Sequence, residues 1–444
     1  MIEAINKAIS KIHDLSRTKP IKVISHFDSD GITSAAIFSK ALQRWNKKFS
    51  LQIVKNLEES IIASLPEDHI LIFLDLASNS LDYLKNKKTE VFIFDHHEIS
   101  QTIPENVTLI NPLLYKHEML SGAGVCYLFA KTLNEKNKDL ASLAVIGMIG
   151  DSMEKDINKS FNEIIKDSEA TIKKGLLIYP STRPLDRALE YSSSPYIPGV
   201  TGSYKGVIDL LRDSNIQRGP GGFKSLHELT EEEMSHLITS IMLRVKNQDA
   251  LHEVIGSLYL IKFFNRLEDA RELSALINAC SRMDQPHVSL GFCLGNAAYK
   301  QQAEKIYIEY KHHLVSALRY MEGSEKIKGE SYTIINARDN IKDTIIGTVA
   351  SILSYSPTYE KGTIIVALAY NQDKIKVSAR LAGKQGKNVR EVLSQAMINI
   401  GGEVGGHPNA AGCLISKEKE EFFIEELKKV LEIESPKNIP TTNV

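Results

Sequence analysis

The sequence predicts an α/β protein with an N-terminal domain on a mainly parallel sheet, a helical insertion or bridge, and a smaller C-terminal α+β domain. Short apolar runs alternate with helical patterns up to about residue 150, helical patterns then dominate, and strand patterns return from about residue 330. A chain of 444 residues is long enough for two or three separate cores. We expect three domains and a tail, at 1–151, 152–325, 326–434 and 435–444.

The strands of the N-terminal domain are predicted from four apolar runs: IKVIS (21–25), LQIVK (51–55), ILIFLD (70–75) and VFIFD (91–95). The runs are continuous rather than alternating, which is typical of strands buried on both faces of a parallel sheet. Amphipathic or apolar helical patterns accompany them, at 1–20, 31–45, 122–133 and 140–150.

The remaining elements follow from similar patterns. Helical patterns in 152–325 are interrupted by Gly- and Pro-rich segments, and the stretch 297–321 is expected to be a connecting helix. The last domain begins with the runs YTIINA, GTIIVALAY and KIKVSAR. A helix at 390–399, a Gly-rich loop, the run CLIS and a charged helix complete its expected α+β pattern.

Composition narrows the classes of protein to consider. The net charge is −1, so nucleic-acid binding would need a local basic groove rather than a global basic field. No apolar run reaches the length of a membrane span, and no membrane partner is expected. The four cysteines are scattered singly without metal or redox spacing, which favours a reducing cytoplasm.

An imidazole and two carboxylates follow the first predicted strand. His26, Asp28 and Asp30 occupy every second position, so they would share one face if the chain stays extended beyond Ser25. Gly31 would then allow a sharp turn into the next helix. Taken alone, the pattern is explained equally well if Asp30 is a helix N-cap and Asp28 a loop residue.

Two further strands and a helix end in similar residues. The third predicted strand ends in Asp75, and the fourth ends in Asp95, directly before His96 and His97. Ligands bind beyond the carboxyl ends of parallel strands, so these residues are expected at one sheet edge. Asp151 follows the apolar helix AVIGMIG, which an ordinary polar residue at a helix end also explains.

Several acids at one site call for positive charge, because without cations they would take up protons or unfold locally. Two divalent metal ions would supply that charge. Mixed imidazole and carboxylate ligands favour Mn²⁺ over Mg²⁺, which prefers oxygen and water, and Co²⁺ is a further candidate.

Four segments in order resemble the motifs of the DHH phosphoesterase family: HFDSDG (26–31), the Asp of FLDL (73–76), FDHH (94–97) and the Asp of MIGD (148–151). The segment LEDARELSALINACSR resembles part of RecJ-like single-strand exonucleases, especially the archaeal GINS-associated type. Bacterial RecJ enzymes also carry a nucleic-acid-binding barrel, for which this sequence shows no pattern.

The resemblance implies a set of metal ligands and roles for their neighbours. It assigns one metal to His26, Asp28 and Asp75, and the other to Asp30, Asp75, His96 and Asp151. Asp75 then bridges the two ions, and His97 faces the substrate phosphate as a catalytic residue beside Asp75. Asp95 would orient a histidine. A structural role for His97 is the alternative.

A second pair of motifs, VSAR (377–380) and GGEVGGHPNAAG (401–412), resembles the DHH-associated domain. The resemblance implies that Arg380, Gly405, Gly406 and His407 hold substrate phosphate. A tight turn capped by Asn409 is the ordinary explanation for the glycines. The sequence departs from the family pattern at Ala77, where many relatives carry glycine, and in VGGH, which lacks a third glycine.

The resemblance implies a two-metal, manganese-dependent phosphodiesterase that degrades single-stranded nucleic acid from an end. DNA and the 5′→3′ direction are favoured, in replication or repair, with single-stranded DNA or RNA and replisome components such as GINS as partners. One alternative is a phosphoesterase acting on short oligonucleotides or cyclic dinucleotides, and another is a 3′→5′ RNA exonuclease. A replisome scaffold is the third, but all six ligand positions are filled here.

Overall fold

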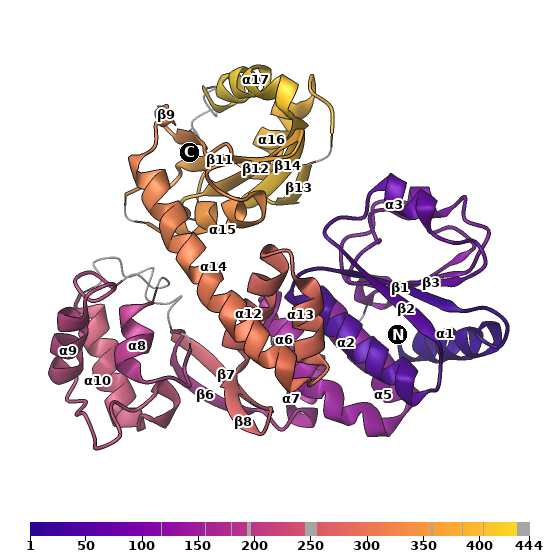
Figure 1. Ribbon diagram of the computed structural model, residues 1–444, viewed down its shortest axis with the longest axis horizontal. Coiled ribbons are helices and arrows are strands. Elements are labelled where there is room, and N and C mark those ends of the chain that lie inside the picture. Colours follow the sequence, from indigo (N-terminus) through magenta and orange to yellow (C-terminus); the bar gives the residue numbers. More distant parts are fainter. Residues whose placement is uncertain are drawn as a thin grey trace, which may run out of the picture. The chain divides into compact units, whose positions relative to one another are not determined.

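The computed structural model describes residues 1–116, 118–155, 157–178, 180–192, 197–244, 255–356, 358–383, 385–402 and 404–432. The chain divides into two compact units, Met1–Tyr307 and Ile308–Val444, and the boundary lies within the long helix α14 (Ala297–Gly323; Figure 1). The expected tail at 435–444 falls outside the described residues. No described helix combines the length and the apolarity that crossing a membrane requires.

The first unit starts with the predicted parallel sheet. Its strands are β1 (Ile21–His26), β2 (Phe49–Val54), β3 (Ile70–Leu74), β4 (Val91–Phe94) and β5 (Val107–Ile110). They lie in the order β2-β1-β3-β4-β5, and every neighbouring pair is parallel. Strands β3 and β4 are buried throughout, as their continuous apolar runs predict, whereas β5 was not expected from the sequence.

Helices cover both faces of this sheet. They are α1 (Ile2–Leu15), α2 (Ser29–Arg44), α3 (Glu59–Ser64), α4 (Leu81–Leu84), α5 (Gly122–Leu133) and α6 (Ala141–Gly150). Helices α3 and α4 pack on one face in a core that includes Phe73. On the other face, the rings of Phe38 in α2, Phe94 in β4 and Phe129 in α5 lie with centroids 4.6–5.1 Å apart.

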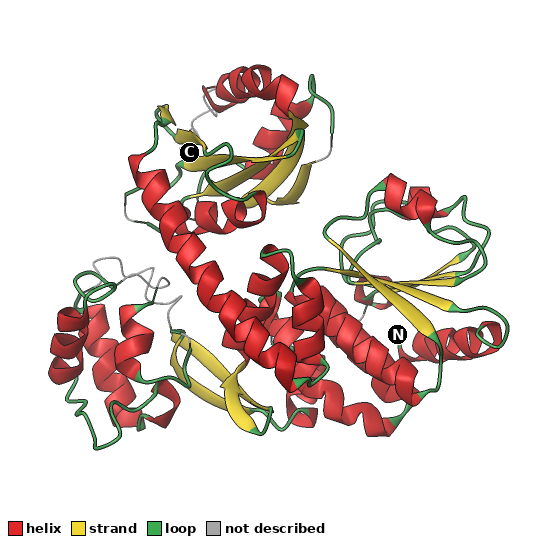
Figure 2. Ribbon diagram, viewed as in Figure 1, coloured by secondary structure: helices red, strands yellow, loops and turns green. Residues whose placement is uncertain are grey.

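The region expected to be helical contains a small sheet as well (Figure 2). Its helices are α7 (Lys159–Asp167), α8 (Leu185–Glu190), α9 (Tyr204–Asp213), α10 (Glu231–Met242), α12 (Ala270–Arg282) and α13 (Pro286–Cys293). Antiparallel strands β6 (Thr171–Leu176), β7 (Ile255–Phe263) and β8 (Arg266–Asp269) lie in the order β6-β7-β8. The first four residues of β6 are exposed or half-buried, so this strand lacks an apolar run that would reveal it.

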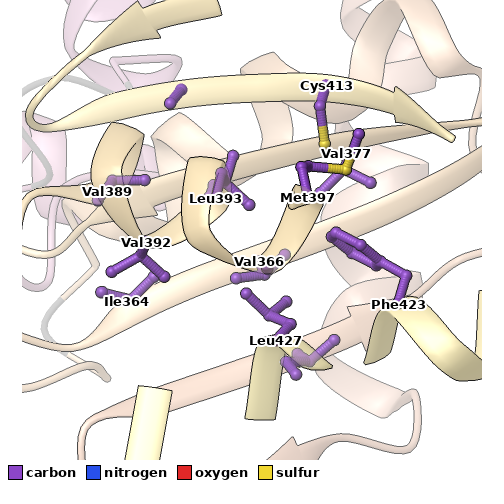
Figure 3. Packing of buried hydrophobic residues seen from close by; sticks show 14 of the residues in the cluster. Ile364, Val366, Val377, Val389, Val392, Leu393, Met397, Cys413, Phe423 and Leu427 are labelled. Carbon is purple, nitrogen blue, oxygen red and sulfur yellow. The ribbon is translucent and has the colours of Figure 1, made fainter. Parts of the chain in front are cut away.

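The second unit is the predicted α+β domain. Its strands are β9 (Ile327–Lys328), β10 (Tyr332–Asn336), β11 (Ile364–Asn371), β12 (Lys374–Leu381), β13 (Val404–His407) and β14 (Ala410–Ser416), in the order β13-β14-β12-β11-β10-β9. Its helices are α15 (Asp343–Ser354), α16 (Val389–Met397) and α17 (Glu420–Glu432). Figure 3 shows Leu393 and Met397 of α16 and Phe423 of α17 packed with the sheet residue Val377 in one buried core.

Candidate metal centre

Three neighbouring strands deliver the predicted site residues to one sheet edge. Strand β3 lies between β1 and β4, and Ser25, Leu74 and Phe94 are in register across them. His26 is the last residue of β1, Asp75 directly follows β3, and Asp95 directly follows β4. The carboxyl ends of these parallel strands therefore meet where a ligand is expected to bind.

The route from His26 to Asp30 differs from the prediction. The chain is extended at His26, the last residue of β1, and at Asp28, but not at Asp30, because helix α2 begins at Ser29. Asp28, rather than Asp30, is the N-cap, and its Oδ1 accepts a 2.9 Å hydrogen bond from the Gly31 amide. Asp30 lies in the first helical turn. A Cβ on Gly31 would lie 2.3 Å from the His26 carbonyl oxygen, so this tight turn requires glycine.

Asp75 lies between two groups of side chains. On one side, His26 Nδ1 is 3.6 Å from Asp75 Oδ2 and 3.1 Å from Asp28 Oδ2. On the other side, His96 Nε2 is 3.3 Å from Asp75 Oδ1 and 3.8 Å from Asp30 Oδ2. The two carboxylate oxygens of Asp75 thus face different neighbours.

Asp151 joins the second of these groups. It follows α6, and its Oδ2 lies 3.7 Å from His96 Nδ1. The structure therefore brings together all six residues that the family resemblance implies as metal ligands: His26, Asp28, Asp30, Asp75, His96 and Asp151.

The backbone at Asp75 is unusual. Asp75 has a φ of 57°, which Asp tolerates better than most residues, and Ala77 follows with a φ of 87°. The alanine that departs from the family pattern therefore lies in a conformation that favours glycine. The Asp75 side chain is 2% exposed, and its Oδ1 makes no hydrogen bond to any of the described residues. A buried carboxylate oxygen without a hydrogen bond fits a site for a cation.

The start of helix α5 holds Asp30 in place. The Gly122 amide donates to Asp30 Oδ2 at 2.6 Å, and the Ala123 amide donates to Oδ1 at 2.9 Å. First-turn amides have no partner within their own helix and favour a negative charge. This contact was not predicted from the sequence. The segment SGAG before an apolar run signals a helix start, and Ser121 is indeed the N-cap.

The pKa values of the predicted ligands reflect burial and the crowding of like charges. Burial and then the charge of Asp75 raise the pKa of Asp30 well above its ordinary range. Burial also raises the pKa of Asp151 to about 6, aided by Asp75 and opposed by His96. Burial alone would lower the pKa of His96, but Asp75, Asp30 and Asp151 outweigh it and raise this pKa to about 10. The carboxylates therefore draw positive charge into the site.

Asp95 organises the loop that carries the two histidines. Its Oδ2 accepts from the Ser78 amide at 2.9 Å, and its Oδ1 accepts from the His96 amide at 2.8 Å. Oδ1 also accepts from His97 Nδ1 at 2.7 Å. This hydrogen bond fixes a proton on Nδ1 of His97, so Nε2 is the ring nitrogen that remains available to a substrate. The His97 side chain is 48% exposed. Asp95 lies close to the cluster, but its oxygens already accept these hydrogen bonds.

The cluster fits divalent metal ions. Ligand atoms within 4.8 Å of one another are offered by His26, Asp28 and Asp75, and separately by Asp30, His96 and Asp151. Each group combines imidazole nitrogen with carboxylate oxygen, a donor set that transition metals accept more readily than Mg²⁺ does. The sharing of Asp75 between its two neighbours makes a paired site chemically reasonable.

The predicted phosphate-binding residues lie together in the second unit. His407 and Arg380 are both in register with Ala410, which lies on the strand between theirs, so the two side chains share one face of the sheet. Arg380 Nε donates to Ser351 Oγ at 2.8 Å, which fixes its guanidinium against α15. A Cβ on Gly406 would lie 2.3 Å from the Ala410 carbonyl oxygen, and its φ is 122°, so this hairpin requires glycine.

Family models match the chain in three places. The model for the DHH family, N-terminal domain, matches residues 20–148, and that for the DHHA1 domain matches residues 329–433. The chain belongs to the DHH family. A third model, for the DHH-CID domain, matches residues 178–258, in the region that joins the other two.

Several proteins are similar to this chain over almost its whole length. An uncharacterized protein of Methanocaldococcus jannaschii is 27% identical over an alignment of 448 positions that covers 97% of each chain. RecJ of Thermus thermophilus in complex with Mn²⁺ has 18% identity and a TM-score of 0.62, covering 98% of this chain and 55% of that one. CDC45 from Entamoeba histolytica has 13% identity and a TM-score of 0.65, covering 97% and 99%. The fold is RecJ-like.

The family, the fold and the acidic cluster agree on a class of chemistry. They support a phosphoesterase or nuclease, a hydrolase of phosphodiester bonds with divalent metal ions, for which nucleic acid is the implied substrate. The likeness to CDC45 indicates a shared fold with that protein.

Proposed function

We propose that this DHH protein is a manganese-dependent exonuclease that degrades single-stranded nucleic acid, with DNA as the favoured substrate, in replication or repair. The observation that carries the proposal is the position of Asp75 between two groups of ligand atoms. His26, Asp28 and Asp75 would hold one ion, and Asp30, Asp75, His96 and Asp151 would hold the other. Paired divalent ions, when bound, stabilise the charge of the attacking and leaving oxygens in phosphodiester hydrolysis.

The protein's own residues would prepare the phosphate for reaction. The hydrogen bond from His97 Nδ1 to Asp95 raises the pKa of His97 against the opposing effect of burial. The exposed His97 ring would therefore offer a proton at Nε2 to a phosphate oxygen or to the leaving oxygen. Asp95 acts through this histidine and is a positioning residue.

The second unit would bind further phosphates of the strand. Arg380 and His407 share one face of the sheet, and the backbone at Gly405 and Gly406 allows close approach of a phosphate. The Arg380 guanidinium is held by Ser351 and by the carbonyl oxygen of Ala379, so little side-chain entropy would be lost on binding. This surface would recognise the backbone rather than the base sequence.

A time course with end-labelled strands tests the proposal. Equal amounts of 5′- and 3′-labelled single-stranded DNA and RNA thirty-mers, of the same DNA as a duplex, and of a labelled dinucleotide are incubated with Mn²⁺ or with EDTA. We expect stepwise shortening of DNA with Mn²⁺ and none with EDTA, and the label that is released first gives the direction, for which 5′→3′ is favoured. Equal cleavage of double-stranded DNA, or cleavage in EDTA, would contradict the proposal.

Two other functions are separated by the same assay. A phosphoesterase for short oligonucleotides or cyclic dinucleotides would cleave a dinucleotide much faster than a thirty-mer. A replisome scaffold would cleave neither, and the full-length likeness to CDC45 is the observation that keeps this function under consideration. We propose replisome components such as GINS as partners of an active nuclease, which a pulldown with purified GINS addresses.

Metal binding should also stabilise the protein. Without cations, burial and the crowding of carboxylates raise the pKa values of Asp30 and Asp151, which shows that the folded site disfavours their charged forms. Mn²⁺ at a hundredfold excess over its dissociation constant should add about 2.7 kcal/mol to the free energy of unfolding. We expect an increase of about 4 °C in the melting temperature, measured by differential scanning fluorimetry and reversed by EDTA. An unchanged melting temperature would contradict the metal site.

A further inference from the structure

Helix α12 supports the metal centre from outside the matched family domains. It spans Ala270–Arg282, whereas the family models match residues 20–148, 178–258 and 329–433. Even so, it packs against α2, which carries Asp30, and against α6, which precedes Asp151 (Figure 1). These two helices belong to the N-terminal domain, more than one hundred residues away in the sequence.

One hydrogen bond connects α12 to the first turn of α2. Asn278 Oδ1 accepts from the Ser29 amide at 2.9 Å. Ser29 is the first residue of α2, where an amide has no partner within the helix, and it lies between Asp28 and Asp30. Because the donor is a backbone amide, only the oxygen of the Asn278 side chain satisfies it, so the orientation of the carboxamide is fixed.

The same face of α12 contacts the segment around Asp151. Arg271 Nη2 donates to Glu154 Oε1 at 2.8 Å, just beyond Asp151. Ser274 approaches Gly150 so closely that a Cβ there would lie 2.7 Å from Ser274 Oγ. Arg271, Ser274 and Asn278 are spaced by three and four residues, which places them on one helical face. This face of α12 thus contacts the start of α2, which carries Asp28 and Asp30, and the segment after α6, which carries Asp151.

We propose that Asn278 is a positioning residue for the metal centre, because it fixes the turn that presents Asp28 and Asp30. The inference rests on the proposed function of the cluster as a metal site. Partners of this kind, which orient ligands without binding the metal, typically change metal affinity by about 10–100-fold when removed. Loss of the Asn278 oxygen frees the Ser29 amide and lets the two carboxylates move apart from their partners.

The test compares four variants in the full-length protein. Asn278→Ala and Asn278→Leu remove the acceptor, and leucine preserves the side-chain volume in case alanine impairs folding. Asn278→Asp keeps an acceptor oxygen at the same place. Ser281→Ala is the matched control, since it removes a buried hydroxyl of the same helix that makes no hydrogen bond to the described residues.

Two measurements are made on each variant. Isothermal titration with Mn²⁺ gives the metal affinity, and hydrogen–deuterium exchange in EDTA gives the protection of residues 24–35 without metal. Asn278→Ala and Asn278→Leu should bind Mn²⁺ about tenfold more weakly and exchange faster in this segment. Asn278→Asp and Ser281→Ala should remain within about threefold of the wild-type affinity.

Each other outcome overturns the inference in a distinct way. Wild-type affinity in Asn278→Ala and Asn278→Leu would refute the positioning role, whether or not exchange becomes faster, and would leave the metal site intact. An equal loss of affinity in Asn278→Asp would show that an acceptor oxygen at this position is not sufficient. Absence of Mn²⁺ binding by the wild-type protein would instead refute the metal site itself, and the inference with it.

Discussion

Replacing Asp75 with asparagine is expected to reduce Mn²⁺-dependent cleavage of single-stranded DNA by about 1,000-fold, the upper end of the range for loss of one preorganised polar group. Asp75 Oδ1 and Oδ2 face the two separate groups of ligand atoms. An amide has one acceptor oxygen and no charge, so it cannot serve both groups. Cleavage is measured as the initial rate of shortening of a labelled thirty-mer.

Asparagine is chosen so that a loss of cleavage can be distinguished from a loss of folding. Asp75 has a φ of 57°, which asparagine also tolerates, and the two side chains have nearly the same shape. The circular dichroism spectrum should therefore stay unchanged, whereas the stabilisation by Mn²⁺ should be lost. Asp139→Asn is the matched control, because Asp139 is exposed and pairs with Arg44 on the surface. Undiminished cleavage by the Asp75→Asn protein would refute the bridging role.

Replacing Gly122 with alanine is expected to weaken Mn²⁺ binding by about 10–100-fold. A Cβ on Gly122 would lie 2.6 Å from Asp75 Cβ and 2.9 Å from Asp75 Oδ1, which is too close for the surrounding atoms to stay in place. The start of α5 must therefore move, and with it the Gly122 amide that donates to Asp30 at 2.6 Å. One methyl group thus disturbs two predicted ligands, and the strain should lower the free energy of unfolding by about 1–3 kcal/mol.

Gly124→Ala is the matched control for this substitution, because it introduces the same methyl group into the same helix. The nearest atoms to a Cβ there belong to the side chains of Leu120 and Met148, at 3.2–3.5 Å, and these can adjust. We expect the Mn²⁺ affinity of this variant to be within about threefold of wild type, since neither Leu120 nor Met148 is a predicted metal ligand. If both variants bind Mn²⁺ equally, the close packing of α5 on Asp75 has no role in the metal site.

The edge of the parallel sheet could be predicted from local patterns alone. Apolar runs mark β1, β3 and β4, and the polar residues that end them must meet if the strands are parallel neighbours. Asp75 and His96 were placed correctly by this argument, because it depends only on where each strand stops. The motif order then allowed the ligands to be grouped by family resemblance.

The supports of the site could not be predicted in this way. The amides of Gly122 and Ala123 reach Asp30 across more than ninety positions in the sequence, and Asn278 reaches Ser29 across 249. Such contacts depend on how helices pack, which periodicity does not specify. The turn before α2 could not be decided locally, because the same residues suit an extended segment and a helix N-cap, and the N-cap is Asp28 rather than Asp30.

We expect two divalent ions to bind on either side of Asp75. Crystals soaked in Mn²⁺ can be examined for anomalous scattering at this site. Two peaks are expected, one beside His26 and Asp28 and the other among Asp30, His96 and Asp151. Crystals without anomalous peaks at this edge of the sheet, and with the six side chains turned away from one another, would contradict this expectation.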